Sequence, residues 1–335
     1  MRRGTRSGCF CFVAVHSTAR GPSLGGCRMW HYEDSRAAMR DALRLSRAMT
    51  YKSAVAGLPL GGGKGVIMLP APQVDTRLRR AALRDFGDTV DQLGGAYITA
   101  EDVGTSAKDM EVIAQQTSYV TGLSRRRGGS GDPSPWTALG VDASIRASLE
   151  RKLGSESPKG RTIVVTGLGH VGLALAKLLA KAGAKLVVAD IDRSKRVFAE
   201  QLGARWVTPA KALTVPADVL APCALGGVLD HESVPKLQVP VVAGAANNQL
   251  ADDPIADLLA ERGILWAPDF VANAGGIINI SVELERGGYD PARARVKVNG
   301  IGDTMREIFE LAHHDADTPF SAAVALASRR VAQAD

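Results

Sequence analysis

The chain has 335 residues, which is enough for two or three domains, since a typical domain has about 100–200. Hydrophobic residues make up 45% and charged residues 23%, as in ordinary globular proteins, and no run approaches the ~20 apolar residues that a membrane-spanning helix needs. The formal net charge of +6 is a mild excess that suits anionic small molecules, so neither a membrane nor a nucleic acid is expected as a partner.

The four cysteines show neither a CxxC pattern nor metal-ligand spacing: Cys9, Cys11, Cys27 and Cys223. We therefore expect reduced thiols in a cytoplasmic protein without a metal site. The apolar residues Phe10–His16 follow a short basic start, as in a signal peptide. That run is short and lacks a small-x-small cleavage site, so a β-strand is the preferred interpretation.

Next along the chain, a helix is expected over Asp34–Met49, because its apolar residues recur near a 3.6-residue period after a capping residue. This helix delivers Lys52 just beyond its end. Composition predicts that Gly57–Gly65 is a loop, followed by a strand over Val66–Leu69 that stops at a proline. The other expectations for this half are a helix over Arg77–Leu93, a strand over Tyr97–Ala100 and a domain boundary in the Gly-, Ser- and Pro-rich segment 128–135.

After this boundary, strands alternate with helices, which indicates a parallel sheet with crossover helices. The expected helices include Val171–Ala182 and Arg193–Leu202, and amphipathic segments over Ala294–His313 and Pro319–Ala334 end the chain. The expected strands are Thr162–Thr166, Lys185–Ala189, Arg205–Val207, Asp218–Ala221, Pro240–Ala243 and Ile264–Trp266.

A GxGxxG pattern at Gly167–Gly172 directly follows an apolar strand and opens a helix. In this context the first glycine forms a tight turn, the second admits a pyrophosphate, and the third lets helix and strand pack closely. Asp190 ends the next strand, 23 residues beyond Gly167, close to the ~20 expected for an acid that binds the adenosine ribose hydroxyls. Its carboxylate repels a 2′-phosphate and favours NAD over NADP, although Arg193 nearby weakens this preference. The alternative is a glycine turn in a Rossmann-like domain that binds no cofactor.

Two lysines in the first half, Lys52 and Lys64, are candidates for function. Lys64 lies in a run of glycines, which expose backbone amides and permit close approach by a small anionic substrate. A Walker phosphate loop is excluded, because it needs glycine at Leu58 and serine or threonine at Gly65. Asp102 stands at a strand end before a Gly-Thr turn, where a catalytic carboxylate and a capping residue are equally expected.

Eight short motifs occur in order between residues 12 and 330. They are Gly21–Gly26, Met49–Lys52, Gly57–Lys64, Thr99–Thr105, Gly131–Pro135, Cys223–Gly227, Gly244–Leu250 and Asn273–Gly276. Together they resemble the motifs of the amino-acid dehydrogenase family that acts on glutamate, leucine, phenylalanine and valine. Within this family the chain is most similar to the leucine and valine dehydrogenases.

The resemblance implies a role for each matching residue. Lys52 would bind the substrate α-carboxylate, Lys64 would be the catalytic base, and Asp102 would take protons from the amino group. To work near neutral pH, Lys64 needs a pKa well below ~10.4, and burial and the neighbouring cation Lys52 would lower it. The implied cofactor-binding residues are Thr137, Gly167, Gly169, His170, Val171, Gly172, Asp190, Cys223, Ala224 and Asn247.

The implied fold is α/β, with a substrate and oligomerisation domain at 1–130, a Rossmann NAD-binding domain at 131–307, and the active site in the cleft between them. Residues 308–335 would pack back on the first domain. The implied reaction transfers the substrate α-hydrogen to NAD as hydride. Water activated by Lys64 then attacks the iminium carbon, which releases ammonia and the 2-oxo acid. A homo-oligomer is implied as well, but the chain begins only a few residues before the first family strand, which leaves the subunit number open.

The implied substrate-binding residues are Lys52, Leu24, Gly25, Ala100, Asn247, Ile277 and Ile280. The four that would line the side-chain pocket are apolar, so an aliphatic branched-chain L-amino acid is expected and glutamate should be rejected. Glutamate-specific relatives place a lysine at the position of Leu24. Phenylalanine is the closer alternative, because relatives that accept it tend to have glycine at the position of Ala100. A non-catalytic NAD-binding subunit is an alternative from another class, against which the intact lysines and aspartate argue.

Overall fold

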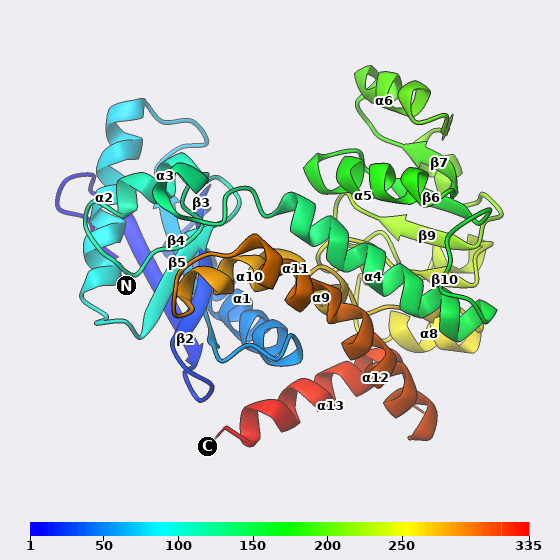
Figure 1. Ribbon diagram of the computed structural model, residues 1–335. Helices are drawn as coiled ribbons and strands as arrows, with labels where there is room; N and C mark the ends of the chain where they lie inside the picture. The colour runs from blue at the N-terminus through cyan, green and yellow to red at the C-terminus, as the bar shows by residue number, and fades with distance from the viewer. Residues whose placement is uncertain (316, 335) are drawn as a thin grey trace. The chain divides into compact units, whose positions relative to one another are not determined.

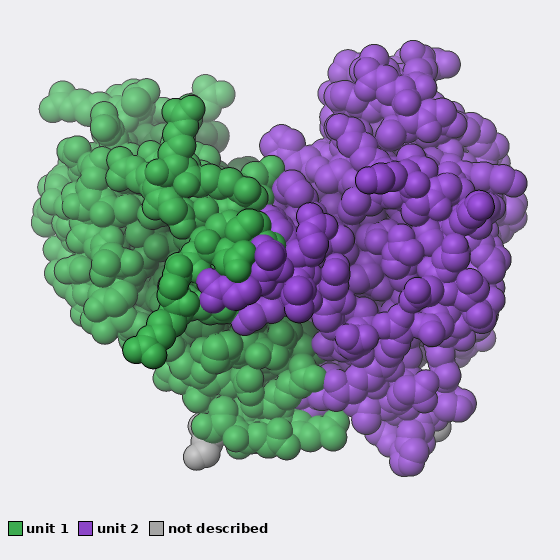
Figure 2. Space-filling model, viewed as in Figure 1, with its two compact units in different colours: residues 1–132, 280–291, 327–335 green, residues 133–279, 292–326 purple. Residues whose placement is uncertain are grey.

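The computed structural model describes residues 1–315 and 317–334 and divides into two compact units (Figure 1, Figure 2). The first unit comprises residues 1–132, 280–291 and 327–335, and the second comprises 133–279 and 292–326. Residues 280–291, expected in the Rossmann domain, group with the first unit, where the Glu283 carboxylate accepts hydrogen bonds from the backbone N–H of Gly122 and Ser130. Of the segment 308–335, expected on the first domain, residues 308–326 group with the second unit and residues 327–335 with the first.

The first unit is built on a five-stranded sheet in the order β1-β2-β4-β3-β5. Strand β2 pairs antiparallel with β4, whereas β3 is parallel to both β4 and β5. The strand expected at Phe10–His16 is present as β2, and β3 was not expected. The bounds are β1 (Arg2–Arg3), β2 (Phe10–Ser17), β3 (Ser23–His31), β4 (Gly61–Leu69) and β5 (Tyr97–Glu101).

Helices cover both faces of this sheet (Figure 1). Helix α1 (Ser35–Val55) packs on one face through a small apolar cluster, and α2 (Thr76–Asp91) and α3 (Ala107–Ile113) pack on the other. The carboxylate of Asp34 accepts a hydrogen bond from Ala37 N and caps α1 as expected. Helix α1 continues beyond the expected end at residue 49, so Lys52 lies in its last turn.

The glycine-rich segment Gly57–Gly65 is not a loop throughout, which corrects the expectation from composition. Its second half begins β4, between β2 and β3 in the middle of the sheet. A Cβ at Gly62 would lie 2.0 Å from Thr50 N of α1, and a Cβ at Gly65 would lie 2.4 Å from the ring of Phe86. The glycines therefore allow a helix and an aromatic ring to approach the strand closely, and composition alone does not distinguish this use from a loop.

The second unit contains a six-stranded parallel sheet in the order β11-β10-β9-β6-β7-β8. Its first strand lies beside its fourth at the centre, which is the strand order of dinucleotide-binding folds. All six expected strands are present; two have the expected bounds, and the ends of the other four differ by at most one residue. The bounds are β6 (Thr162–Thr166), β7 (Lys185–Ala189), β8 (Arg205–Trp206), β9 (Val219–Pro222), β10 (Val241–Val242) and β11 (Leu265–Trp266).

Helix α5 begins at His170, directly after the loop between β6 and the helix, so its N-terminus faces the carboxyl end of the sheet. The single segment expected over 294–313 is two helices that meet at Gly300. No helix of the described residues is both long and apolar enough to cross a membrane. The helices of residues 133–332 are α4 (Ser134–Leu153), α5 (His170–Lys181), α6 (Arg196–Gln201), α7 (Pro209–Ala212), α8 (Ile255–Glu261), α9 (Asp269–Ala272), α10 (Gly275–Ser281), α11 (Pro291–Asn299), α12 (Ile301–His314) and α13 (Pro319–Ala332).

Candidate active site

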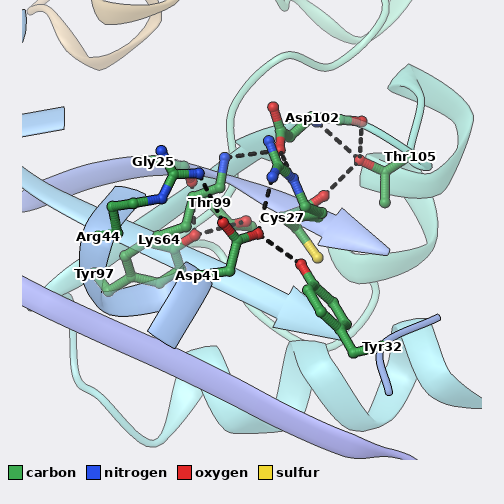
Figure 3. Close-up of polar contacts among 11 residues, drawn as sticks. Gly25, Cys27, Tyr32, Asp41, Arg44, Lys64, Tyr97, Thr99, Asp102 and Thr105 are labelled. Atoms are coloured by element: carbon green, nitrogen blue, oxygen red, sulfur yellow. Dashed lines mark hydrogen bonds and ion pairs between the residues drawn. The ribbon is translucent and has the colours of Figure 1, made fainter. Parts of the chain in front are cut away.

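Lys64 and Asp102 form an ion pair on the face of the first sheet that α1 covers (Figure 3). The Nζ of Lys64 on β4 donates a hydrogen bond of 2.7 Å to Oδ2 of Asp102, which directly follows β5. Strand β3 runs between them, and its residue at this level is Gly26, where a Cβ would lie 2.6 Å from the Cβ of Asp102. The structure thus brings two of the predicted residues together, and the missing side chain of Gly26 is what makes room for the contact.

Burial and charge shift the pKa values of this pair. Lys64 is only 4% exposed, and burial lowers its pKa; the ion pair with Asp102 opposes that decrease, and the cation Arg28 adds to it. Arg28 is a neighbouring cation that the sequence did not indicate, in addition to the expected Lys52. Burial alone would raise the pKa of Asp102, but Lys64 and Arg28 outweigh it and lower that pKa. Asp102 is therefore charged at neutral pH, and Lys64 releases its proton more readily than an exposed lysine.

Arg28 belongs to a group of charged side chains that sequence reasoning missed. Its Nε donates to Oδ2 of Asp102 at 3.0 Å, and its Nη1 donates to Oδ2 of Asp41 on α1 at 2.9 Å. Figure 3 shows Asp41 in turn accepting from the hydroxyl of Tyr32, at 2.7 Å, and from Arg44, at 3.0 Å. Arg28 lies two residues after Gly26, so the alternation of strand residues would have placed it on this face had β3 been expected.

The backbone of Asp102 is held separately from its side chain. Its N–H donates to the Thr105 hydroxyl at 2.9 Å, and that hydroxyl donates to the carbonyl of Cys27 at 2.8 Å. Helix α3 is capped by Ser106 and Asp109 instead. Asp102 is therefore not a helix cap, which was one of the two roles expected from the sequence. Its carboxylate instead accepts hydrogen bonds from the two cations, Lys64 and Arg28.

Two of the expected substrate residues share the face of Lys64. In the parallel register, Leu24 lies beside Gly62, and Ala100 lies beside Gly26, so both side chains point to the α1 side of the sheet. Both are buried, as are Ile277 and Ile280 in α10. Gly25 differs, because its position faces the other side and its carbonyl accepts a 2.6 Å hydrogen bond from the Tyr97 hydroxyl. Ile277 belongs to the second unit and Ile280 to the first.

The glycine loop of the second unit meets the end of β9 at the point where the strand order reverses. Gly167 has a φ of +93°, and a Cβ there would lie 2.7 Å from that of Ala224, which follows Cys223 after β9. A Cβ at Gly172 would collide with the Gly167 carbonyl, whereas nothing lies within 4 Å of one at Gly169, the N-cap of α5. This loop fits a pyrophosphate, because it combines open space with the N–H groups of a helix N-terminus.

Asp190 lies where the ribose acid of such a site belongs, but it already has partners. Its carboxylate accepts hydrogen bonds from Leu168 N at 2.7 Å, Asp192 N at 2.8 Å and Lys195 Nζ at 2.9 Å. Burial would raise its pKa, but these donors lower it, so the group is charged. A carboxylate has about four acceptor sites, so one remains for a ribose hydroxyl. Lys195 is a cation that the sequence pattern did not indicate at this position, where Arg193 was expected nearby.

The remaining predicted residues lie in loops and helix starts of the second unit. Asn247 is exposed, and its Oδ1 accepts a hydrogen bond from Asn273 at 2.8 Å. Thr137 is in the first turn of α4, where its hydroxyl donates to the carbonyl of Pro133 at 3.2 Å. The four cysteines are free thiols, as expected. The structure thus gathers the glycine loop, Asp190 and residues 223–224 at one edge of the sheet.

Comparisons with known proteins agree with this arrangement. Residues 1–119 match the family model described as "Glu/Leu/Phe/Val dehydrogenase, dimerisation domain", and residues 188–335 match that of "Glutamate/Leucine/Phenylalanine/Valine dehydrogenase". Residues 140–224 also match the NAD binding domain of the D-isomer specific 2-hydroxyacid dehydrogenases. The second unit is therefore an NAD-binding Rossmann domain.

Individual relatives are similar over nearly the whole chain. The leucine dehydrogenase of Thermoactinomyces intermedius is 45% identical over 332 residues, which cover 99% of this chain and 89% of that protein. The valine dehydrogenase of Streptomyces virginiae is 44% identical, with 98% and 91% covered. The crystal structure of L-tryptophan dehydrogenase from Nostoc punctiforme superimposes with a TM-score of 0.85 at 39% identity, with 98% and 93% covered. The chain belongs to the glutamate/leucine/phenylalanine/valine dehydrogenase family.

Proposed function

We propose that the protein catalyses the reversible, NAD-dependent oxidative deamination of a branched-chain L-amino acid: valine, leucine or isoleucine. The products are the 2-oxo acid, ammonia and NADH. The observation that carries the proposal is the ion pair of the buried Lys64 with the partly buried Asp102, on a sheet face that also presents the apolar side chains of Leu24 and Ala100. Identity of 44–45% to leucine and valine dehydrogenases supports it.

The residues of the first unit have distinct roles in this proposal. Lys64, whose pKa is lowered by burial, acts as the general base on the attacking water. Asp102 accepts protons from the substrate amino group, since its carboxylate is charged at neutral pH. Lys52, in the last turn of α1, binds the α-carboxylate as a cationic donor. The other substrate-binding residues of the proposal are Leu24, Gly25, Ala100 and Ile280 in the first unit and Ile277 and Asn247 in the second.

In the second unit, the proposed NAD-binding residues hold and orient the cofactor. NAD, when bound, supplies the hydride acceptor. The backbone N–H groups at the start of α5 bind the pyrophosphate, and Asp190 accepts from a ribose hydroxyl. Thr137 and Asn247 contact the carboxamide side. The loop residues in this set are Gly167, Gly169, His170, Val171, Gly172, Cys223 and Ala224.

A panel of L-amino acids tests the proposal directly. NADH formation is measured with valine, leucine, isoleucine, phenylalanine, tryptophan, glutamate and glutamine at equal concentrations. Branched-chain substrates should give the highest kcat/KM, and glutamate should give none above background, because its carboxylate would lose water without a cationic partner. A preference for phenylalanine or glutamate would select one of the alternative substrates. Cofactor binding without turnover on any of them would indicate a non-catalytic subunit.

We further propose a cytoplasmic homo-oligomer that associates through the first unit. Support comes from the match of residues 1–119 to a family model described as a dimerisation domain. The first unit also exposes large apolar side chains, among them Trp30 at 54% and Leu43 at 56%. Light scattering on the purified protein should show a mass of two or more chains. A monomer at micromolar concentration would contradict this proposal.

A further inference from the structure

We propose that Arg28 is a positioning residue that holds the Asp102 carboxylate by one oxygen, so that the other oxygen stays available to the substrate amino group. This inference rests on the proposed function. The first observation is that two cations share a single oxygen: Lys64 Nζ lies 2.7 Å and Arg28 Nε 3.0 Å from Oδ2. Among the described residues no side chain or backbone N–H donates to Oδ1, and the Asp102 side chain is 24% exposed.

Arg28 can do this because it is itself fixed from the other side. Its Nη1 donates to Oδ2 of Asp41 at 2.9 Å, and Asp41 is held by Tyr32 and Arg44. The guanidinium therefore bridges two carboxylates, that of Asp41 on α1 and that of Asp102 after β5, and it uses a different nitrogen for each. A planar, forked group fits this bridge, whereas the single ammonium of a lysine cannot reach both carboxylates in the same geometry.

The charge of Arg28 acts on both members of the ion pair. It lowers the pKa of Lys64 and contributes to lowering the pKa of Asp102. Its removal should therefore raise both. Asp41 and Tyr32 are the titratable groups next to Arg28 on this face. The thiol of Cys27 lies on the opposite face of β3, and burial raises its pKa well above the usual value, so it is uncharged. Since the proposed base must be deprotonated, loss of Arg28 should shift the acidic limb of the deamination profile to higher pH.

The position of Arg28 makes a rescue experiment possible. Arg28 and Asp41 line a surface pocket of about 490 Å³, together with Trp30, Tyr32 and Val103. A substitution Arg28→Ala would extend this pocket toward Asp102. Methylguanidinium added in solution has the same planar donors and could occupy the vacated place between Asp102 and Asp41.

The experiment compares Arg28→Ala, Arg28→Lys and the control Arg44→Ala by pH profiles of kcat and kcat/KM with leucine. Arg44 is 61% exposed and contacts only Asp41 among the residues of this group, so its variant removes a cation without touching Asp102. Arg28→Ala should lower kcat by roughly 10–100-fold, in the range of a lost positioning or proton-transfer contact. Its acidic limb should shift upward, and methylguanidinium should restore kcat saturably. Arg44→Ala should show neither the shift nor the rescue.

A second readout does not depend on turnover. NMR titration of ¹³C-labelled lysine in the apo protein, with the Lys64 signal assigned from Lys64→Met, should show a higher Lys64 pKa in Arg28→Ala than in the wild type. An unchanged Lys64 titration together with an unchanged kcat profile would overturn the inference. If Arg28→Ala does not fold, the Arg28→Lys variant tests the inference, because lysine keeps the charge but does not bridge the two carboxylates. A wild-type kcat in that variant would overturn the inference too. Absence of activity in the wild-type enzyme would instead contradict the proposed function.

Discussion

Lys64 lies on β4 and Asp102 directly follows β5, two strands that are not neighbours, yet the two side chains meet at 2.7 Å across β3. The residue of β3 that lies between the two side chains is Gly26, and a side chain at this position would occupy the space of the Asp102 side chain. The ion pair therefore depends on a glycine that carries no chemistry of its own. Gly62 and Gly65 play a similar part, since they let α1 and Phe86 pack against β4 on either side of Lys64.

Gly26→Ala should disrupt this pair. A Cβ would lie 2.6 Å from the Cβ of Asp102 and 2.7 Å from the Glu101 carbonyl, so β5 or its following turn must shift. We expect a fall in kcat of roughly 100-fold or more, because small displacements of catalytic groups have effects of that size. Gly302→Ala is the control, since its Cβ would make only ordinary contacts, the nearest at 3.5 Å. Normal kinetics in a folded Gly26→Ala protein would contradict the role given to this glycine.

Lys64→Ala should abolish turnover while leaving NAD binding nearly intact, because the lysine belongs to the first unit and not to the glycine loop of the second. The expected loss in kcat is about 10²–10⁴-fold, typical of a general base. Lys52→Ala should instead raise KM for the amino acid. Steady-state kinetics and fluorescence titration with NADH measure these effects, and Lys108→Ala, an exposed lysine of the same unit, is the control. If both active-site variants kept wild-type kinetics, the assigned roles would have to be abandoned.

The Gly167–Gly172 loop could be predicted from the residues alone, because its spacing after a strand and before a helix reflects what such a loop binds. The roles of Lys64 and Asp102 were assigned through the family resemblance and are part of the proposed function. Strand β3 was missed because its glycines and polar residues do not alternate like a half-buried strand. Because β3 was not expected, Arg28 was missed as well. Its hydrogen-bond partners lie 13 and 74 residues away along the chain. Contacts of that kind depend on register and topology, which a local pattern does not contain.

The same reasoning explains the misread glycine segment. A run of glycines predicts a loop when only local conformational freedom is considered. Here Gly61–Gly65 form the start of a central strand, because the neighbours of that strand leave no room for side chains. The six strands of the second unit were predictable, since parallel strands buried on both faces read as continuous apolar runs.

Asp85 anchors the N-terminal residues to α2 and gives the first unit a pH-dependent part of its stability. It is 3% exposed and accepts hydrogen bonds from Ser7 N at 2.8 Å, the Ser7 hydroxyl at 2.6 Å and Arg6 Nη1 at 3.0 Å. Burial would raise its pKa, but these donors lower it. The stabilisation is therefore fully present above the ordinary carboxyl pKa of ~3.9 and is lost as pH falls through the lower folded-state value.

Asp85→Asn should reduce the free energy of unfolding by about 1–3 kcal/mol at neutral pH, because its amide places a donor against other donors. The difference from wild type should shrink in acid, where the carboxylate of the wild type is protonated too. Denaturant unfolding at several pH values measures both effects. Asp88→Asn should change stability much less, because among the described residues the half-buried Asp88 carboxylate bonds only to Arg6. Equal destabilisation by Asp85→Asn at all pH values would show that the charge of Asp85 does not contribute to the free energy of unfolding.

NAD should be strongly preferred over NADP through Asp190, whose charged carboxylate hydrogen-bonds a ribose hydroxyl and repels a phosphate. Asp190→Ala should weaken NAD binding and narrow the difference between the cofactors. Lys195 provides an internal control, since its Nζ lies 2.9 Å from Asp190 and partly offsets the repulsion. Lys195→Met should therefore make the preference for NAD stronger. Equal kcat/KM with NAD and NADP in the wild type would refute the specificity assigned to Asp190.

Ala100→Gly should raise activity on phenylalanine relative to leucine. Ala100 is 4% exposed and lies on the Lys64 face of the sheet, level with Gly26, where its methyl group limits the space beside the ion pair. One methylene of difference is worth only about 1–3 kcal/mol, so the branched-chain substrates should overlap and the variant should change their ratio to phenylalanine by roughly tenfold.

The measurement is kcat/KM for leucine, valine and phenylalanine in wild type and variant. Ala322→Gly in α13 is the control for a general loss of stability, because it removes the same methyl group from a buried site in the second unit. A wild-type enzyme that prefers phenylalanine to both valine and leucine would contradict the assignment of the side-chain pocket to Leu24 and Ala100. The role of Lys64 and Asp102 in deamination would be unaffected by that result, since both groups act on the α-carbon substituents that every amino-acid substrate shares.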